Sequence, residues 1–241
     1  MGCSHSHHVL EMESRPVRPV ILSNHSAGSV MMPSTFQDQP EPGLTRQQIM
    51  DAFQHMAEYL NECGVSIECV AVDGAVNTLY LHSKESTHDV EFLLDPASDD
   101  YKTLSNAAVF ANRQAQEKLG CEWFNNSMQL FVPQSVQTAL VQEAKHQDEV
   151  VFEHQGTNGG LKVYAAPWSF AFCGKLNRLC DIDDAIVYLH RYLSLTGQDY
   201  VIARWIYDEC QKYHQDVSQK VLKRLEDGYA RTHGNWPIVW N

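Results

Sequence analysis

The sequence predicts an α+β fold, in which a mixed β-sheet with flanking helices extends to about residue 166 and a helical bundle follows. Two observations support this. Four or five short β-rich segments are interrupted by helical patterns, and after Ala166-Pro167 the pattern is helical only. The turn at Gly74 also lacks the G-x-G-x-x-G pattern of a dinucleotide-binding Rossmann sheet. We therefore expect a disordered tail over residues 1–44, an α/β core over 45–166 and a helical region over 167–241.

The first predicted helix, over residues 46–62, carries signals at both ends. Thr45 is a suitable N-cap, and Gln48 completes a capping box with it. Gly64 ends the helix. Apolar residues at helical spacing form its buried face: Ile49, Phe53, Met56 and Leu60.

The remaining elements follow from apolar periodicity and from the turn residues between them. Two strands meet at a Gly-Gly turn, which is a hairpin signal. In chain order we expect a strand at 65–73, a short helix at 75–82, a strand at 88–94, a helix at 106–119 after a Ser105 cap, a short strand at 128–132, a helix at 134–146, hairpin strands at 149–153 and 161–165, and helices at 168–179, 183–195, 200–213 and 217–229.

Composition restricts the class of function. The net charge of -12 argues against broad non-specific DNA binding, which needs clustered Lys and Arg. It leaves a nucleotide substrate open, because a bound metal ion supplies local positive charge. The seven cysteines are odd in number and show no C-x-x-C spacing, so a reducing, cytoplasmic location is expected. No apolar run is long enough to predict a transmembrane helix, which needs about 18 residues.

The N-terminus resembles a lipidation signal. Residues 1–6 fit the M-G-x-x-x-[ST] pattern for N-myristoylation of Gly2, and Cys3 beside it could take a palmitate. Two acyl groups would anchor the chain stably to a membrane, whereas one binds only weakly. The alternative is an ordinary disordered start, because only Arg15 and Arg18 offer nearby basic support. Membrane contact through acylation therefore stays one of two interpretations.

The stretch over residues 70–94 carries the chemistry that the sequence suggests. Asp89 and Glu91 lie two residues apart on a predicted strand, so both point to the same face. Val90, Phe92 and Leu94 would face inward. A pair of carboxylates can hold Mg²⁺. The alternative is that the two acids form the solvated face of an edge strand, and periodicity alone does not exclude it.

Three further features could bind a phosphate near these acids. Gly74 would let the backbone approach a phosphate closely. Ser86 or Thr87 could donate hydrogen bonds to phosphate oxygens. Lys175, although distant in the sequence, could reach the same triphosphate as a point charge.

The order of these features resembles the nucleotidyltransferase superfamily. The order is a helix, a strand, Gly74-Ala75 and then the S-T-x-D-h-[DE]-h pattern that begins at Ser86. It looks most like the branch of abortive-infection type toxin nucleotidyltransferases and related uncharacterised domains. Later segments that are similar to this branch are residues 119–126, 161–167, 175–178 and 181–186, so the resemblance covers roughly residues 46–196.

The resemblance implies a nucleotidyltransferase-like mixed sheet and a Mg²⁺-dependent activity. A nucleoside monophosphate would pass from a nucleoside triphosphate (NTP) to an acceptor, which could be RNA, a protein or a small molecule. In this reading the metal ligands are Asp89 and Glu91, the nucleotide-binding residues are Gly74, Ala75, Ser86 and Thr87, Lys175 contacts the triphosphate, and Asp184 places Lys175 or the acceptor.

The sequence also departs from the family pattern. Glu85 stands where Arg is usual in this branch, with Lys84 one place earlier. Active members often carry a third carboxylate on a later strand, but the segment 161–165 has none and only Glu153 could replace it. A second hypothesis therefore stays open, namely a catalytically inactive interaction module with the same fold, tethered to a membrane through Gly2 and Cys3.

Overall fold

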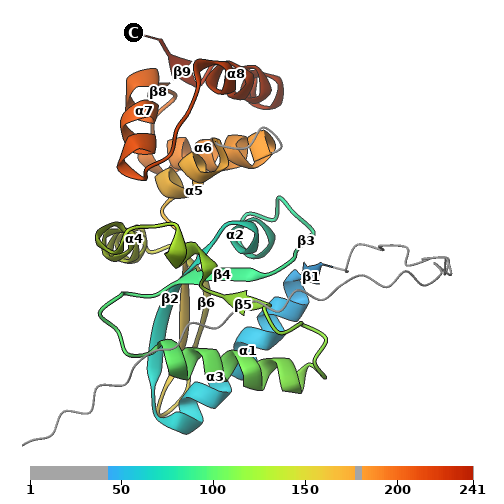
Figure 1. The fold of residues 1–241 in the computed structure, drawn as a ribbon. Helices are drawn as coiled ribbons and strands as arrows, with labels where there is room; N and C mark the ends of the chain where they lie inside the picture. The colour runs from blue at the N-terminus through green and yellow to red at the C-terminus, as the bar shows by residue number, and fades with distance from the viewer. Residues whose placement is uncertain (1–42, 177–180, 241) are drawn as a thin grey trace, which may run out of the picture. The chain divides into compact units, whose positions relative to one another are not determined.

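The computed structural model describes residues 43–176 and 181–240 (Figure 1). The candidate lipidation sites Gly2 and Cys3 lie outside these ranges. Leu44 was expected in the disordered tail, but it is buried and belongs to strand β1 (Leu44–Thr45). In the described part of the chain, no helix combines the length and the apolar character that crossing a bilayer requires.

Helix α1 (Arg46–Cys63) forms as the sequence predicts. The Thr45 side chain accepts a hydrogen bond from the backbone of Gln48, and the Gln48 side chain accepts one from the backbone of Thr45, which completes the capping box. At the other end Gly64 has φ 71°, a left-handed conformation that Gly adopts without strain. The buried face of α1 includes the four apolar residues expected there.

A mixed five-stranded sheet forms the centre of the described fold, with strand order β5-β4-β2-β7-β6. Its strands are β2 (Ser66–Val72), β4 (Val90–Leu93), β5 (Phe124–Asn125), β6 (Val150–Gln155) and β7 (Gly160–Ala165). Strand β2 runs parallel to β7 and antiparallel to β4. The fold class is therefore α+β with a mixed sheet, as predicted. A separate two-stranded pair joins β1 to β3 (Ser86–Thr87).

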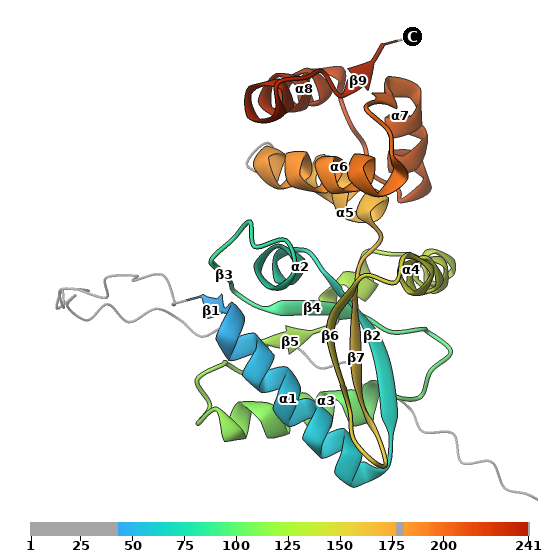
Figure 2. The ribbon, with the colours of Figure 1, turned by 180° about the vertical axis from the view of Figure 1, so that it is seen from behind.

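Helices flank this sheet (Figures 1 and 2). Helix α3 (Tyr101–Gln114) packs against α1, and α4 (Gln134–Gln147) contacts β2 and β7. The short α2 (Gly74–Leu79) follows β2 directly. Beneath the sheet, the Phe53 ring of α1 lies 5.4–6.4 Å from the rings of three aromatic residues: Trp123, Phe124 and Phe152.

Two predicted elements of the core were wrong. The helix expected at 106–119 runs over 101–114: it begins one turn before the supposed Ser105 cap, and its buried stripe begins at Leu104. The strand expected at 128–132 is a 3-10 helix, η1 (Ser127–Leu130). The segment is mostly apolar, but Leu130 is 84% exposed and packs into no core.

The chain after β7 contains the helices α5 (Trp168–Leu176), α6 (Ile182–Thr196), α7 (Ala203–Lys212) and α8 (Gln219–His233). Helix α5 packs on α6 and α7, and α6 packs on α8. The sequence predicted helices only in this region. The structure adds a parallel pair of two-residue strands, β8 (Val201–Ile202) and β9 (Ile238–Val239). Such short strands carry too few residues to show a period.

Candidate functional site

A small polar pocket lies where β2 and β7 end and β4 begins. Its volume is about 210 Å³. Four carboxylates and two lysines line it, which gives a formal charge of -2 with His88 neutral. The lining residues are Val72, Asp73, Gly74, Lys84, Thr87, His88, Asp89, Glu91, Lys175 and Asp181.

The carboxylate pair of β4 faces this pocket. Val90 and Phe92 are buried in the core, whereas Asp89 and Glu91 are half-buried and line the pocket. The predicted alternation of the strand is therefore confirmed. The Asp89 carboxylate accepts a hydrogen bond of 2.7 Å from Nδ2 of Asn125, on the neighbouring strand β5. This contact fixes the orientation of one candidate metal ligand.

Lys175 reaches the pocket from α5, about one hundred residues away in the sequence. Its side chain is only 6% exposed and forms an ion pair with Asp73. Its Nζ also lies 3.5 Å from Asp184 and 3.9 Å from Asp181. Lys84 contacts the same Asp184 carboxylate at 2.6 Å. Asp184 is therefore held between two lysines, beside the pocket and outside its lining.

Asp73 is the main residue that sequence reasoning missed. Its backbone has φ 56° and ψ -131°, a combination that only Gly adopts readily and that costs about 1–3 kcal/mol in other residues. The Tyr188 hydroxyl holds this peptide by donating a 3.0 Å hydrogen bond to the Asp73 carbonyl. Burial, together with the nearby Asp184 charge, raises the pKa of Tyr188, so the hydroxyl keeps its proton. The only sequence signal was an Asp-Gly dipeptide at a strand end.

Gly74 and Thr87 lie against each other at the pocket wall. A Cβ at position 74 would collide with the Thr87 hydroxyl oxygen, so only Gly permits this approach. The Thr87 hydroxyl donates a 3.1 Å hydrogen bond to the carbonyl of Asp89. The two other predicted phosphate-binding residues lie outside the lining. Ser86 is exposed on β3, paired with Thr45, and Ala75 is buried within α2.

Glu153, the residue that could replace the family's third carboxylate, does not reach the pocket. Glu153 lies on β6, at the far edge of the sheet, and its carboxylate is 3.7 Å from Lys162. Among residues 43–176 and 181–240, no three His, Cys, Asp or Glu side chains are arranged to hold a metal ion. Mg²⁺ often binds through one or two carboxylates together with water and substrate phosphates. Two carboxylates such as Asp89 and Glu91 would leave the other coordination positions of such an ion to water or phosphate oxygens.

A second polar cluster joins α6 to the residue that follows α2 and the residue that precedes β6. The Tyr80 hydroxyl bonds to Glu149, and Arg191 contacts the same carboxylate at 2.6 Å. Burial, followed by the hydrogen bond with Glu149, raises the pKa of Tyr80. Arg191 also lies over the rings of Tyr80 and Trp168. These contacts attach α6 to the core and so support the position of Asp184 on the same helix.

Comparison of the chain with known protein families, with curated proteins and with solved structures gives no match.

Proposed function

We propose that this protein has a nucleotidyltransferase-like fold and that the pocket binds an NTP with Mg²⁺, transferring a nucleoside monophosphate to an acceptor. The observation that carries the proposal is that residues far apart in the sequence come together in one pocket. Gly74, Thr87, Asp89, Glu91 and Lys175 were selected from the sequence as phosphate- or metal-binding residues, and all of them line one pocket. Two carboxylates with one lysine beside a glycine turn suit a triphosphate with its metal ion.

Asp89 and Glu91 would hold the metal ion. When bound, Mg²⁺ would supply positive charge that neutralises the charge developing on the phosphates during transfer. This charge matters here because the lining has a formal charge of -2. A free triphosphate would be repelled by the lining, so we expect nucleotide and metal to bind only together.

The other residues would act on the phosphates directly. Lys175 would approach the triphosphate as a point charge. Asp184 and Asp181 lie within 4 Å of its Nζ, so they keep the ammonium at the pocket. Thr87 would donate its hydroxyl proton to a phosphate oxygen instead of to the Asp89 carbonyl. Gly74 leaves room for the phosphate beside the backbone.

The alternative is a catalytically inactive module that keeps the fold for interaction. It is favoured by the position of Glu153 outside the pocket and by the pairing of Lys84 and Lys175 with carboxylates. Acylation of Gly2 and Cys3 would then place the module at a membrane. A Gly2→Ala variant that partitions to membranes as the wild type does would rule out this role of acylation.

Isothermal titration calorimetry tests the Mg²⁺-dependent nucleotide binding that the proposed activity requires. Wild-type protein is titrated with each NTP in the presence of Mg²⁺, and again with EDTA in place of the metal. We expect binding only with Mg²⁺, and a loss of affinity of at least about tenfold (about 1.4 kcal/mol) in Asp89→Asn and in Glu91→Gln. Glu153→Gln is the matched control, because it removes a strand carboxylate that lies outside the pocket. Absence of binding by the wild type, or unchanged binding by Asp89→Asn, would rule out the proposed activity.

A further inference from the structure

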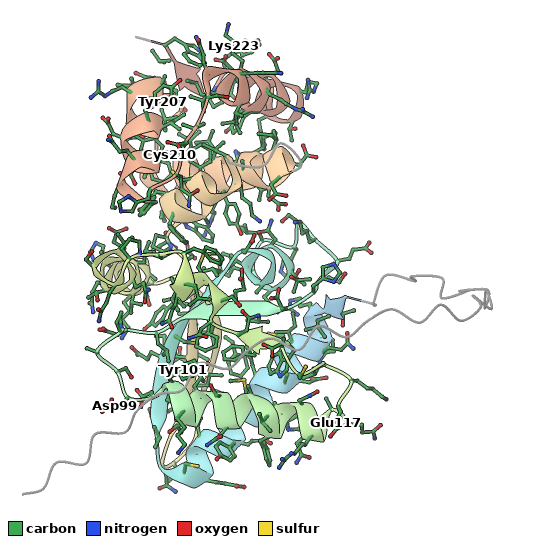
Figure 3. The ribbon with its side chains drawn as sticks, in the orientation of Figure 1. Asp99, Tyr101, Glu117, Tyr207, Cys210 and Lys223 are labelled. Carbon is green, nitrogen blue, oxygen red and sulfur yellow. The ribbon has the colours of Figure 1, made fainter. Side chains whose placement is uncertain are left out.

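A larger groove lies beside the pocket. We call it the α3 groove. It has a volume of about 560 Å³ and runs between α3 and the segment 121–130, which includes β5 and η1. Tyr101, which begins α3, and Glu117, in the turn that follows the helix, are both labelled in Figure 3, and both line the groove. A volume of this size is in the range of sites that hold ligands or short chain segments.

Asn125 connects the α3 groove to the candidate metal ligands. Its side chain lines the groove, and its Nδ2 donates the 2.7 Å hydrogen bond to Asp89. Its backbone is the register partner of Glu91 in the sheet. The Asn125 Oδ1 also accepts hydrogen bonds from the backbone and the hydroxyl of Ser127, which begins η1. A molecule in the groove would therefore lie next to the residues that would hold the metal ion.

The rim of the groove is apolar and exposed. Leu130 is 84% exposed and Phe131, which follows it, is 79% exposed. Across the groove Val109 on α3 is 51% exposed. Large apolar side chains that gather beside a polar cleft are typical of protein-binding surfaces. They provide anchor points for the apolar side chains of a partner.

The charges of the groove disfavour a nucleic acid. Its lining contains Arg113 but also Glu117 and Glu122, and the chain as a whole carries a net charge of -12. A phosphate backbone needs clustered Lys and Arg. Amide side chains instead line much of the groove, at Asn126 and Gln129 among others, and they can pair with the main chain of a polypeptide.

The position of β5 at the end of the sheet also favours a polypeptide in the groove. Within the described part of the chain, β5 is the last strand of the order β5-β4-β2-β7-β6, with β4 on its inner side. Both residues of β5 line the groove. An extended polypeptide can add its main chain to such an edge while its side chains enter neighbouring pockets.

We infer that the acceptor of the transfer is a polypeptide that lies in the α3 groove and presents a Ser, Thr or Tyr hydroxyl to the site beside Asp89. The inference rests on the proposed function. In the reaction, the acceptor oxygen forms a bond to the α-phosphorus of the NTP. The bond from that phosphorus to the bridging oxygen breaks, pyrophosphate leaves, and the hydroxyl proton passes to solvent.

The test uses full-length protein, Mg²⁺ and α-³²P-labelled NTPs with two acceptor pools. One pool contains degenerate ten-residue peptides with a central Ser, Thr or Tyr, and the other contains random-sequence RNA 20-mers. We expect label on the peptides and none on the RNA. A Leu130→Ser/Phe131→Ser variant should lose at least tenfold in kcat/KM for the peptides and keep its affinity for Mg²⁺-NTP. The matched control is Tyr200→Ser/Trp236→Ser, which removes two exposed large hydrophobic residues that do not line the groove.

Each outcome has one meaning. Label on RNA alone, or NTP binding without labelling of any peptide, would overturn the polypeptide acceptor while leaving NTP binding intact. Peptide labelling that Leu130→Ser/Phe131→Ser leaves unchanged would overturn the role of the groove. Absence of NTP binding in calorimetry would instead reject the proposed function, and the acceptor assignment with it.

Discussion

The ion pair between Lys175 and Asp73 gives the sharpest test of how the pocket is held together. We consider a double-mutant cycle of Lys175→Met and Asp73→Asn. Met keeps the apolar stem of the lysine, and Asn has nearly the same size and shape as Asp, so Asp73→Asn removes the charge without changing the backbone strain at position 73. The Lys175 side chain is 6% exposed and that of Asp73 is 26% exposed, so this ion pair is neither fully buried nor fully exposed.

The expected coupling energy follows from this partial burial. Exposed pairs contribute about 0.2–1 kcal/mol, and breaking a buried pair costs about 3–5 kcal/mol, so we expect about 1–3 kcal/mol here. The free energy of unfolding is measured by urea denaturation at neutral pH for wild type, both single variants and the double variant. Lys175→Met should be the more destabilising single change, because it leaves several carboxylates around a nearly buried position.

An internal control cycle comes from Arg204→Met and Asp208→Asn. These residues also form an ion pair, at 2.9 Å, but their side chains are 80% and 55% exposed. We expect their coupling to stay below about 1 kcal/mol. A coupling at Lys175 and Asp73 that does not exceed the control value would refute the view that burial strengthens the pocket pair. The Asp73→Asn variant should also bind Mg²⁺-NTP more tightly than wild type, because Lys175 would lose one of the carboxylates that share it and the pocket lining would lose one negative charge.

Three further predictions test the fold around the site. Phe53→Ala should lower the free energy of unfolding by about 3–5 kcal/mol, because a fully buried ring is lost; a loss below 1 kcal/mol in urea denaturation would contradict the packing. Gly159→Ala should unfold at lower urea concentration, because its Cβ would collide with the backbone of Val65; an unchanged midpoint would show that this contact gives way. Burial, and then His190, lower the pKa of His233 below 6.5, so the folded protein loses stability as pH falls through 6.5 toward that lowered pKa. His233→Asn should therefore make the melting temperature in calorimetry less dependent on pH between 7.5 and 5.5. The same pH dependence in the variant as in the wild type would exclude this contribution.

The sequence predicted those parts of the fold that are encoded locally. The capping box at Thr45 and Gln48 and the stop at Gly64 locate α1 because each signal acts within one helical turn. The alternation in β4 assigned Asp89 to the open face because the strand has one buried side. The strand predicted at 128–132 was wrong because the segment is mostly apolar without a clear period. No packing partner covers Leu130 or Phe131, so the apolar composition alone does not indicate a buried strand.

The candidate site was less predictable, because its partners are set by tertiary contacts. Asp73 gave no sign of its ion pair with Lys175, since nothing local encodes a contact across one hundred residues. Lys84 was noted only as a neighbour of Glu85, whereas the structure pairs it with Asp184. Glu153 is a carboxylate, as a third acid would have to be, but it lies on β6 at the edge of the sheet that is far from the pocket.

Strand topology explains why the pocket residues nevertheless meet. Strands β2 and β7 are parallel, so Val72 and Ala165 end at the same edge of the sheet. Strand β4 is antiparallel to β2, and therefore it begins at that edge, next to Asp89. Helix α5 leaves β7 at the same edge and brings Lys175 over the turn that carries Asp73. The position of the site is thus a consequence of the sheet order, while its chemistry depends on a few side chains that the sheet does not require. For that reason substitutions at Asp89 and Glu91 can abolish the proposed activity and leave the fold intact.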